Sequence, residues 1–116
     1  MGTLEDGQWT NVFIDLTALT PNKREEMLRS RVAAGIALLN EREWSAPWYF
    51  QINLDTLDIA DPLNCMIGQL FDDYVEGLEA LNLSLGILYG FSGVYEEALT
   101  AIWDEEIRKL REDHVQ

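Results

Sequence analysis

The chain has 116 residues, 47% of them hydrophobic and 10% aromatic, which suits one domain with a modest core and argues against a disordered protein. Its formal net charge of −13 excludes direct nucleic-acid binding, because the chain has no excess of basic side chains to displace counterions from phosphates. It has no apolar run long enough to span a membrane, no secretory signal and only one cysteine, so we expect a cytoplasmic protein without an internal disulfide or a membrane partner.

The first predicted helix covers residues 21–43. Thr20 and Pro21 have the residue types of an N-cap and a first helical position. Gly35 lies on the apolar arc of this helix, which indicates that another element approaches closely there. Arg31 projects from the same arc. We expect its guanidinium either to extend to solvent or to pair with a polar group across a helix interface.

The longest amphipathic pattern predicts a central helix over residues 61–82. Asp61 is expected to be its N-cap and Asn82 its left-handed stop. Cys65 falls opposite the apolar arc, so we expect a thiol outside the core. The nearby helix N-terminus could lower its pKa, but His114 lies in the tail, so we expect a structural or idle thiol and no catalytic Cys–His pair. The arc itself consists of Leu63, Met66, Ile67, Leu70, Phe71, Tyr74, Leu78 and Leu81.

The third predicted helix covers residues 94–112 and follows a glycine-punctuated apolar turn. Trp103 is expected in the core. Glu106 projects from the middle of the apolar arc of this helix. For Glu106, as for Arg31, the sequence leaves two alternatives: a side chain that reaches solvent, or an ion pair across the helix interface.

The remaining segments complete the predicted fold. Residues 12–16 and 48–53 are apolar and β-branched enough to pair as a short two-stranded ribbon, although each could instead be the apolar lead-in to a helix. Residues 1–10 are expected to form a loose polar arm and residues 113–116 a frayed tail. The expected fold class is therefore mainly α: a single domain over residues 1–116 with three helices and an optional β-ribbon.

The negative charge is concentrated in one part of the chain. Residues 43–107 contain thirteen acidic residues and no lysine or arginine, whereas the other eight acids are matched by eight bases. Such a segment either is a solvated surface that keeps the protein soluble or attracts a basic partner. In the second case its carboxylates could stand in for phosphates, as in a DNA mimic that occupies the groove of a nucleic-acid-binding enzyme.

Four carboxylates of the central helix are the sharpest candidate site: Asp72, Asp73, Glu76 and Glu79. As an open surface they suit a basic protein. As magnesium ligands they suit a hydrolase of nucleotides or diphosphates, but that site also needs carboxylates from a second helix and a cation for the phosphate, and no base lies nearby in sequence. We therefore predict neither a metal nor a cofactor.

Two tryptophans in the connection after the first helix are candidate anchors for a partner. Trp44 and Trp48 flank Ser45-Ala46-Pro47. Aromatic side chains often carry much of the binding energy at protein interfaces. In that role Trp44 and Trp48 would line an exposed edge.

Three stretches resemble a group of small acidic proteins from actinobacteria and their phages. They are AAGIALLNER at 33–42, INLDTLDI at 52–59, and CMIGQLF at 65–71 with Tyr74 following. The resemblance covers residues 30–110. It implies a bacterial cytoplasm, a phage or prophage gene and a protein that binds a host protein, and it carries over no catalytic residue.

The sequence thus favours a non-enzymatic acidic protein that modulates or inhibits a host protein with a basic surface. Its contacts would be Asp72, Asp73, Glu76 and Glu79, with Trp44 and Trp48 as anchors. One alternative is the magnesium-dependent hydrolase, which needs the four carboxylates to face a second carboxylate helix in a cleft. Another is a homo-oligomeric structural protein, which needs a large apolar patch between like chains.

Overall fold

The structure is a computed structural model that describes residues 18–83 and 86–115. This part of the chain is mainly helical and contains no strand, so the predicted fold class is confirmed. Two single 3-10 turns, η2 and η3, separate the α-helices. In chain order the elements are α2 (Pro21–Asn40), η2 (Trp48–Phe50), α3 (Met66–Phe71), α4 (Tyr74–Ala80), η3 (Ile87–Tyr89) and α5 (Glu96–Val115).

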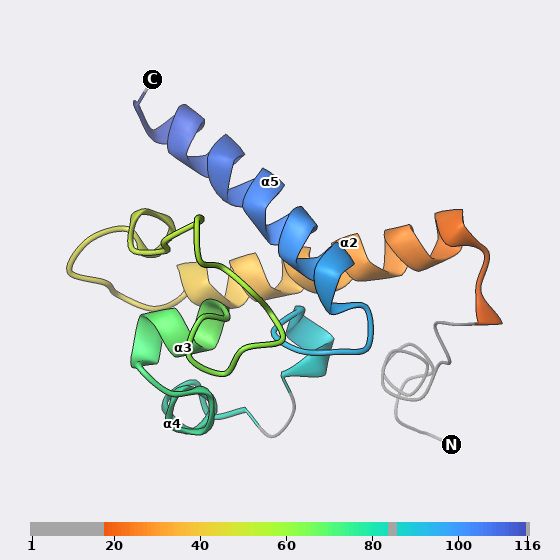
Figure 1. Ribbon diagram of the computed structural model, residues 1–116. Helices are drawn as coiled ribbons and strands as arrows, with labels where there is room; N and C mark the ends of the chain where they lie inside the picture. The colour runs from red at the N-terminus through yellow and green to blue at the C-terminus, as the bar shows by residue number, and fades with distance from the viewer. Residues whose placement is uncertain (1–17, 84–85, 116) are drawn as a thin grey trace, which may run out of the picture.

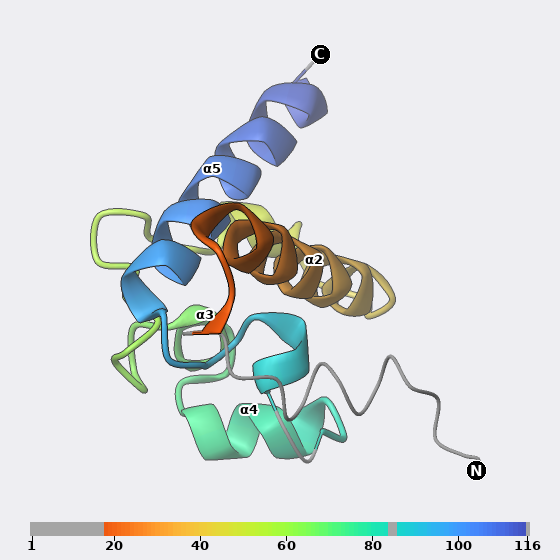
Figure 2. The same ribbon diagram turned by 90° about the vertical axis from the view of Figure 1, so that its right-hand side faces the viewer.

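The long helices α2 and α5 cross near the centre of the molecule (Figure 1). The short helices α3 and α4 pack against each other on one side of α2, and η3 packs against α2. The C-terminal half of α5 extends away from α3 and α4 (Figure 2). No helix in the described part of the chain is both long and apolar enough to cross a membrane.

Helix α2 begins as its sequence predicts. The Thr20 side chain accepts a hydrogen bond from the backbone N–H of Lys23 at 3.3 Å, and Pro21 occupies the first turn. The helix ends at Asn40, three residues before the predicted end, and the N–H of Glu41 bonds back to Leu38 and Leu39. The sequence therefore predicts the start of α2 correctly and its end to within three residues.

Gly35 marks the close approach that its position on the apolar arc predicts. A Cβ atom added there would lie 2.3 Å from the carbonyl oxygen of Tyr89 and 3.0 Å from the Trp103 ring. A side chain at this position would therefore separate α2 from η3. Directly after η3, Gly90 adopts φ 73°, a left-handed conformation that glycine reaches without a steric penalty.

The core lies around Trp103 of α5, which is fully buried. Its ring stacks on Phe91 with centroids 5.8 Å apart and meets Trp48 edge-on at 6.2 Å. Its indole N–H donates to the carbonyl oxygen of Gly90 at 2.8 Å, so the only polar atom of this side chain is satisfied. The predicted core position of Trp103 is confirmed.

The central helix predicted over residues 61–82 is not continuous, and this prediction is wrong. The Asp61 carboxylate accepts hydrogen bonds from the N–H of Leu63 and the side-chain amide of Asn64, both at 2.9 Å, which makes a local turn instead of a helix cap. Helix α3 therefore starts five residues later, at Met66. It ends after Phe71 and is followed by a separate helix, α4.

Two aspartates produce the break between α3 and α4. Asp72 adopts a left-handed conformation with φ 71°, which ends α3. Asp73 then acts as the N-cap of α4, because its carboxylate accepts the backbone N–H of Glu76 at 3.0 Å. The predicted left-handed stop at Asn82 is confirmed, with φ 62° and a hydrogen bond from the N–H of Leu83 to the carbonyl oxygen of Leu78.

Cys65 is buried, which corrects the prediction of a thiol outside the core. Its exposed fraction is 1%, and its sulfur accepts the backbone N–H of Gly68 at 3.3 Å as the N-cap of α3. Burial raises the pKa of the thiol, outweighing the hydrogen bonds that favour the thiolate. The cysteine is therefore a structural residue with little nucleophilic character.

The strand predicted over residues 48–53 is also wrong. Trp48–Phe50 form the 3-10 turn η2, which packs against α5, and residues 12–16, its predicted partner, lie outside the described residues together with the predicted arm, 1–10. The aromatic side chains that suggested a strand instead pack beside α5. Trp48 donates its indole N–H to the side-chain oxygen of Asn40 at 2.9 Å, which connects η2 to the end of α2.

The tail predicted to fray beyond residue 112 is helical through Val115. His114 lies 3.1 Å from the hydroxyl of Tyr49, measured from its Nδ1 atom, and its ring packs edge-on against Phe50. Arg111 donates its Nε–H to the carbonyl oxygen of Tyr49 at 2.8 Å. These contacts with the η2 segment hold the last turns of α5, which α2 and α3 do not cover.

We predict that the Gln69 side chain contributes more to the free energy of unfolding than its partly exposed position suggests. Its amide oxygen accepts the N–H of Asn53 at 2.6 Å, and its amide nitrogen donates to the carbonyl oxygens of Asn53 and Asn64 at 3.2 and 3.0 Å. Gln69→Met keeps the length but loses all three bonds, so the free energy of unfolding should fall by about 1–2 kcal/mol in urea titrations.

Gln51→Met is the matched control for that experiment. The Gln51 side chain is exposed and makes one hydrogen bond, to the carbonyl oxygen of Ala46. Its loss should change the free energy of unfolding by about 0.5 kcal/mol or less. Equal effects of the two substitutions would contradict the role of Gln69 as the bridge between the 53–64 loop and α3.

Candidate acidic binding surface

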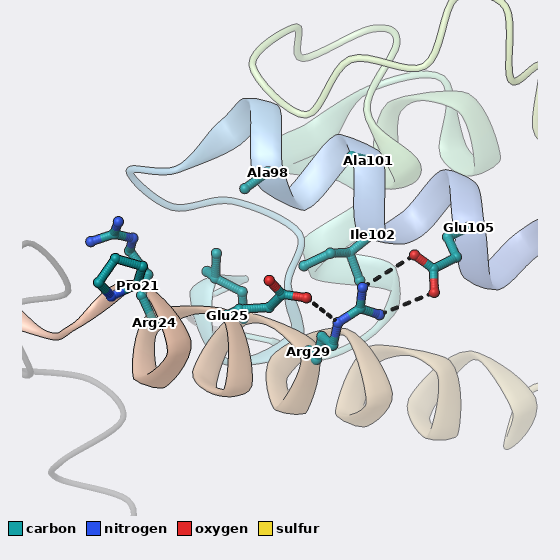
Figure 3. A pocket seen from close by; sticks show the side chains of 9 residues that line it. Pro21, Arg24, Glu25, Arg29, Ala98, Ala101, Ile102 and Glu105 are labelled. Atoms are coloured by element: carbon teal, nitrogen blue, oxygen red, sulfur yellow. Dashed lines mark hydrogen bonds and ion pairs between the residues drawn. The ribbon is translucent and has the colours of Figure 1, made fainter.

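The basic side chains of the described chain are engaged within the molecule. Arg29 of α2 pairs with Glu25 at 2.8 Å and, across the helix crossing, with Glu105 of α5 at 3.1 Å (Figure 3). Both hydrogen bonds raise the pKa of Arg29, and the bond with Glu105 has the larger effect. The same contact lowers the pKa of Glu105. Lys109 completes this network with Glu105 and Glu106, each at 3.3 Å.

Other bases make contacts of different kinds. Arg24 lies over the ring of Tyr95 at 4.6 Å, and Arg108 pairs with Asp104 of its own helix. Arg42 donates to the carbonyl oxygen of Ala80 at 3.2 Å and lies over the rings of Trp44 and Phe71. These basic side chains therefore contact other groups of the protein, and most of them lie on α2 and α5.

The sequence leaves the same two alternatives for Arg31 and Glu106, and the structure gives a different outcome for each residue. Arg31 is buried at 4% exposure, and burial lowers the pKa of its guanidinium, so the alternative of a side chain reaching solvent is wrong for it. Glu106 pairs with Arg29 of α2 at 3.7 Å and with Lys109. The alternative of a pair across the helix interface is thus confirmed for Glu106, in an exposed network where such pairs stabilise weakly.

The acids of residues 43–97 contrast with this network. Within residues 18–83 and 86–115, none of these acids takes part in an ion pair. We call them the unpaired acids. They are Glu43, Asp55, Asp58, Asp61, Asp72, Asp73, Glu76, Glu79, Glu96 and Glu97.

Four of the unpaired acids meet at one groove, although they lie about forty residues apart in sequence. The groove, about 880 Å³, runs between the 55–60 loop and the start of α5, and we call it the acidic groove. Thr100 holds its two walls together: its hydroxyl accepts the N–H of Ile59 at 2.9 Å and donates to the carbonyl oxygen of Glu96 at 2.8 Å. The four acids are Asp55, Asp58, Glu96 and Glu97.

The four acids predicted as the main contacts lie elsewhere, at the α3–α4 junction and on α4. Asp72, Glu76 and Glu79 are exposed and Asp73 is half-buried as the N-cap of α4. They do not share the face of one helix as predicted, because the helix breaks at Asp72. We call these four residues the junction acids.

The geometry required by the magnesium hydrolase is missing from the described chain. Within residues 18–83 and 86–115, no three histidine, cysteine or carboxylate side chains lie close enough together to hold a metal ion. The acids of α5 that could have faced the junction acids, Asp104 to Glu106, are instead engaged with Arg29, Arg108 and Lys109.

The two tryptophans predicted to line an exposed edge have different positions. Trp48 is buried at 2% exposure, so the prediction that it is an exposed anchor is wrong; its ring fills the space between η2 and Trp103. Trp44 is half-buried, packs against Phe71 with ring centroids 5.7 Å apart and donates its indole N–H to the carbonyl oxygen of Leu39. Only Trp44 keeps a surface that a partner could reach.

A second groove, of about 390 Å³, lies between α2 and α5 (Figure 3). Leu28 and Ile102 contribute apolar side chains to it, and Arg29 crosses it to reach Glu105. Three of its charged side chains, Glu25, Arg29 and Glu105, are matched by one another, and the fourth, Arg24, lies over the ring of Tyr95. The groove therefore has no cluster of uncompensated acids.

Asp61 predicts a pH dependence of stability. The hydrogen bond from the N–H of Leu63, followed by that from Asn64, lowers the pKa of this carboxyl below its ordinary value. A lowered pKa in the folded state adds stability above the ordinary pKa, and this stability is lost as pH falls through the folded value. Asp61→Asn keeps one acceptor oxygen for the N–H of Leu63 but loses the second oxygen, which accepts from Asn64, and it cannot titrate. Thermal melts should show wild type more stable than the variant at neutral pH, with the difference shrinking in acid; a difference that is constant with pH would contradict this.

The acidic groove was not predicted from the sequence. The regular spacing of Asp55, Asp58 and Asp61 and the acidic start of the last helix are both visible in the chain, but their meeting depends on how the 55–60 loop folds onto α5. The signal that could have found it is the polar Thr100 one turn after Glu96, next to an otherwise apolar helix face. Comparisons with protein-family models, curated proteins and solved structures find no significant match for this chain.

Proposed function

We propose that this protein is a non-enzymatic binding protein that engages a basic surface of a partner protein through its unpaired acids. The observation that carries the proposal is the separation of charge within the fold. The ion pairs cluster along α2 and α5, whereas none of the acids of residues 43–97 forms an ion pair among the described residues. Uncompensated charge of one sign steers a partner of opposite sign and favours it over neutral ones.

Seven of the ten unpaired acids are exposed, as such a partner needs. The acidic groove gives four of them two facing walls, and exposed Val94, 71% accessible, lines the same groove as an apolar contact. The junction acids add a second group on α4. A partner that normally binds a phosphate backbone would find carboxylates in place of phosphates on such a surface, and the resemblance to actinobacterial and phage proteins makes a host enzyme of this type the partner we favour.

The alternatives have less support. The hydrolase lacks its second set of carboxylates in the described chain. For a homo-oligomer, the large exposed apolar residues of the part of the chain that the structure describes lie on four separate segments and give no specific support to one apolar interface: Phe50, Leu63, Val75 and Val94.

The experiment is an affinity capture from host lysate with wild type and three matched variants. One neutralises the acidic groove, one the junction acids, and the third neutralises four exposed acids outside residues 43–107 as a control. Each variant changes Asp to Asn and Glu to Gln at four sites, so the net charge falls from −13 to −9 in all three. The control sites are Glu26, Glu41, Glu112 and Asp113.

We expect a basic protein that wild type and the control variant retain at low salt and release as salt rises. The groove or junction variant should lose that protein. Asn still caps α4 and tolerates the left-handed conformation at residue 72, so the junction variant keeps its fold. Equal capture by all four baits would mean that the unpaired acids are only a solvated surface, and the proposal would be wrong.

A further inference from the structure

The α3–α4 junction has the features of a conformational switch. The apolar positions of residues 66–81 follow one helical period without interruption, and the break at residues 72–73 contains neither glycine nor proline. Residues with this pattern are compatible with a single helix. The observed bend must therefore be held by specific contacts instead of by a residue that forbids the helix.

Two features set the balance between the bent and the continuous form. Asp72 holds φ 71°, a conformation that is strained for a residue with a side chain, although aspartate tolerates it better than most. This strain disfavours the bend. Opposing it, Asp73 caps α4, and α4 lies so close to α3 that a Cβ atom at Gly77 would be 2.1 Å from a methyl group of Ile67.

The bent form also has a tether at its far end. The guanidinium of Arg42 donates to the carbonyl oxygen of Ala80, the last residue of α4, at 3.2 Å. Among the described helices α4 packs mainly against α3, and its Tyr74 and Leu78 side chains also lie beside Gly86.

We infer that residues 66–80 switch between the bent α3–α4 pair and one continuous helix, with Asp72 as the hinge and the contact of Gly77 with Ile67 as the latch. The continuous form would carry the junction acids outward on a single helix and uncover Ile67, which is fully buried in the bend. This inference concerns the free chain and does not depend on the proposed function.

Two substitutions should move the switch in opposite directions. Gly77→Ala places a methyl group where α4 meets Ile67, so it opposes the bend, while it favours a continuous helix, in which residues 67 and 77 are far apart. Asp72→Gly removes the strain of the left-handed conformation and weakens a helix through residue 72, so it favours the bend.

The measurement is the distance between spin labels at residues 63 and 80, both exposed, in a Cys65→Ser background that keeps an N-cap acceptor. In a continuous helix residues 66 and 80 are about 21 Å apart along the axis. We expect Gly77→Ala to add a longer-distance population of at least about half, with helical circular dichroism unchanged or increased. Asp72→Gly should give one narrow, shorter distance.

The inference would be overturned if the distances in Gly77→Ala equal those in wild type. It would also be overturned if they broaden while helical content falls, because α4 would then unfold instead of joining α3. Amide hydrogen exchange distinguishes the same outcomes, since protection at residues 72–74 should rise in Gly77→Ala and fall if α4 unfolds.

Discussion

Replacing Trp103 with alanine is expected to lower the free energy of unfolding by about 4 kcal/mol. The side chain is fully buried, stacks on Phe91 and meets Trp48 edge-on, and its indole N–H satisfies the carbonyl oxygen of Gly90. Alanine would leave a large cavity at the α2–α5 crossing and an unsatisfied buried carbonyl. Urea titration followed by circular dichroism measures the loss.

Trp103→Phe separates the two contributions of this residue. Phenylalanine keeps an aromatic ring against Phe91 but cannot donate to Gly90, so we expect a loss of about 2 kcal/mol. Trp44→Phe is the matched control, because Trp44 also donates its indole N–H to a carbonyl but is only half-buried. If Trp103→Phe costs no more than Trp44→Phe, Trp103 is not the centre of the core.

Gly35→Ala is expected to destabilise the protein by at least about 2 kcal/mol, although alanine is the better helix former. The added Cβ would lie 2.3 Å from the carbonyl oxygen of Tyr89, which belongs to the backbone and cannot rotate away as a side chain could. The helix would have to move away from η3 and Trp103. Thermal melting should show the loss directly.

Ser30→Ala in the same helix is the control for Gly35. Ser30 is exposed, so the substitution should change the free energy of unfolding by about 0.5 kcal/mol or less, as a gain from helix propensity. Similar melting temperatures for the two variants would show that α2 and η3 are not in close contact at this point.

Features governed by local chemistry could be predicted from the sequence. Thr20 and Pro21 start α2, Asn82 adopts the left-handed conformation that follows α4, and Gly35 lies where another element approaches. The first two depend on the residue itself or on neighbours within four positions, and the prediction for Gly35 depends on its place on the apolar arc of its own helix. The buried position of Trp103 follows from the apolar arc of its helix.

Features decided by competing contacts could not be predicted. The amphipathic pattern of residues 61–82 is the same for one helix and for two, and the choice depends on side-chain caps: Asp61 forms a turn, Cys65 caps α3 and Asp73 caps α4. Asp61 is a residue type that often caps helices, but its carboxylate accepts hydrogen bonds within a turn instead. The burial of Trp48 depends on η2 packing against α5, which is a long-range contact.

The candidate site also has features that the sequence predicts and features that it does not. The concentration of acids in residues 43–107 is a property of the sequence, and the network that engages Arg29 and Lys109 with Glu105 and Glu106 explains why the α5 acids differ from the rest. The acidic groove instead required the 55–60 loop and the start of α5 to meet. Thr100 joins them through two hydrogen bonds that no spacing rule indicates.

We propose that the unpaired acids, and not the ion-paired part of α2 and α5, contact the partner. The most direct measurement is a titration of ¹⁵N-labelled protein with the captured basic protein, followed by amide chemical shifts at low and high salt. We expect the shift changes to concentrate at residues 55–58, 72–79 and 96–97 and to diminish as salt rises. Shifts confined to residues 23–29 and 104–111, or shifts that salt does not weaken, would contradict it.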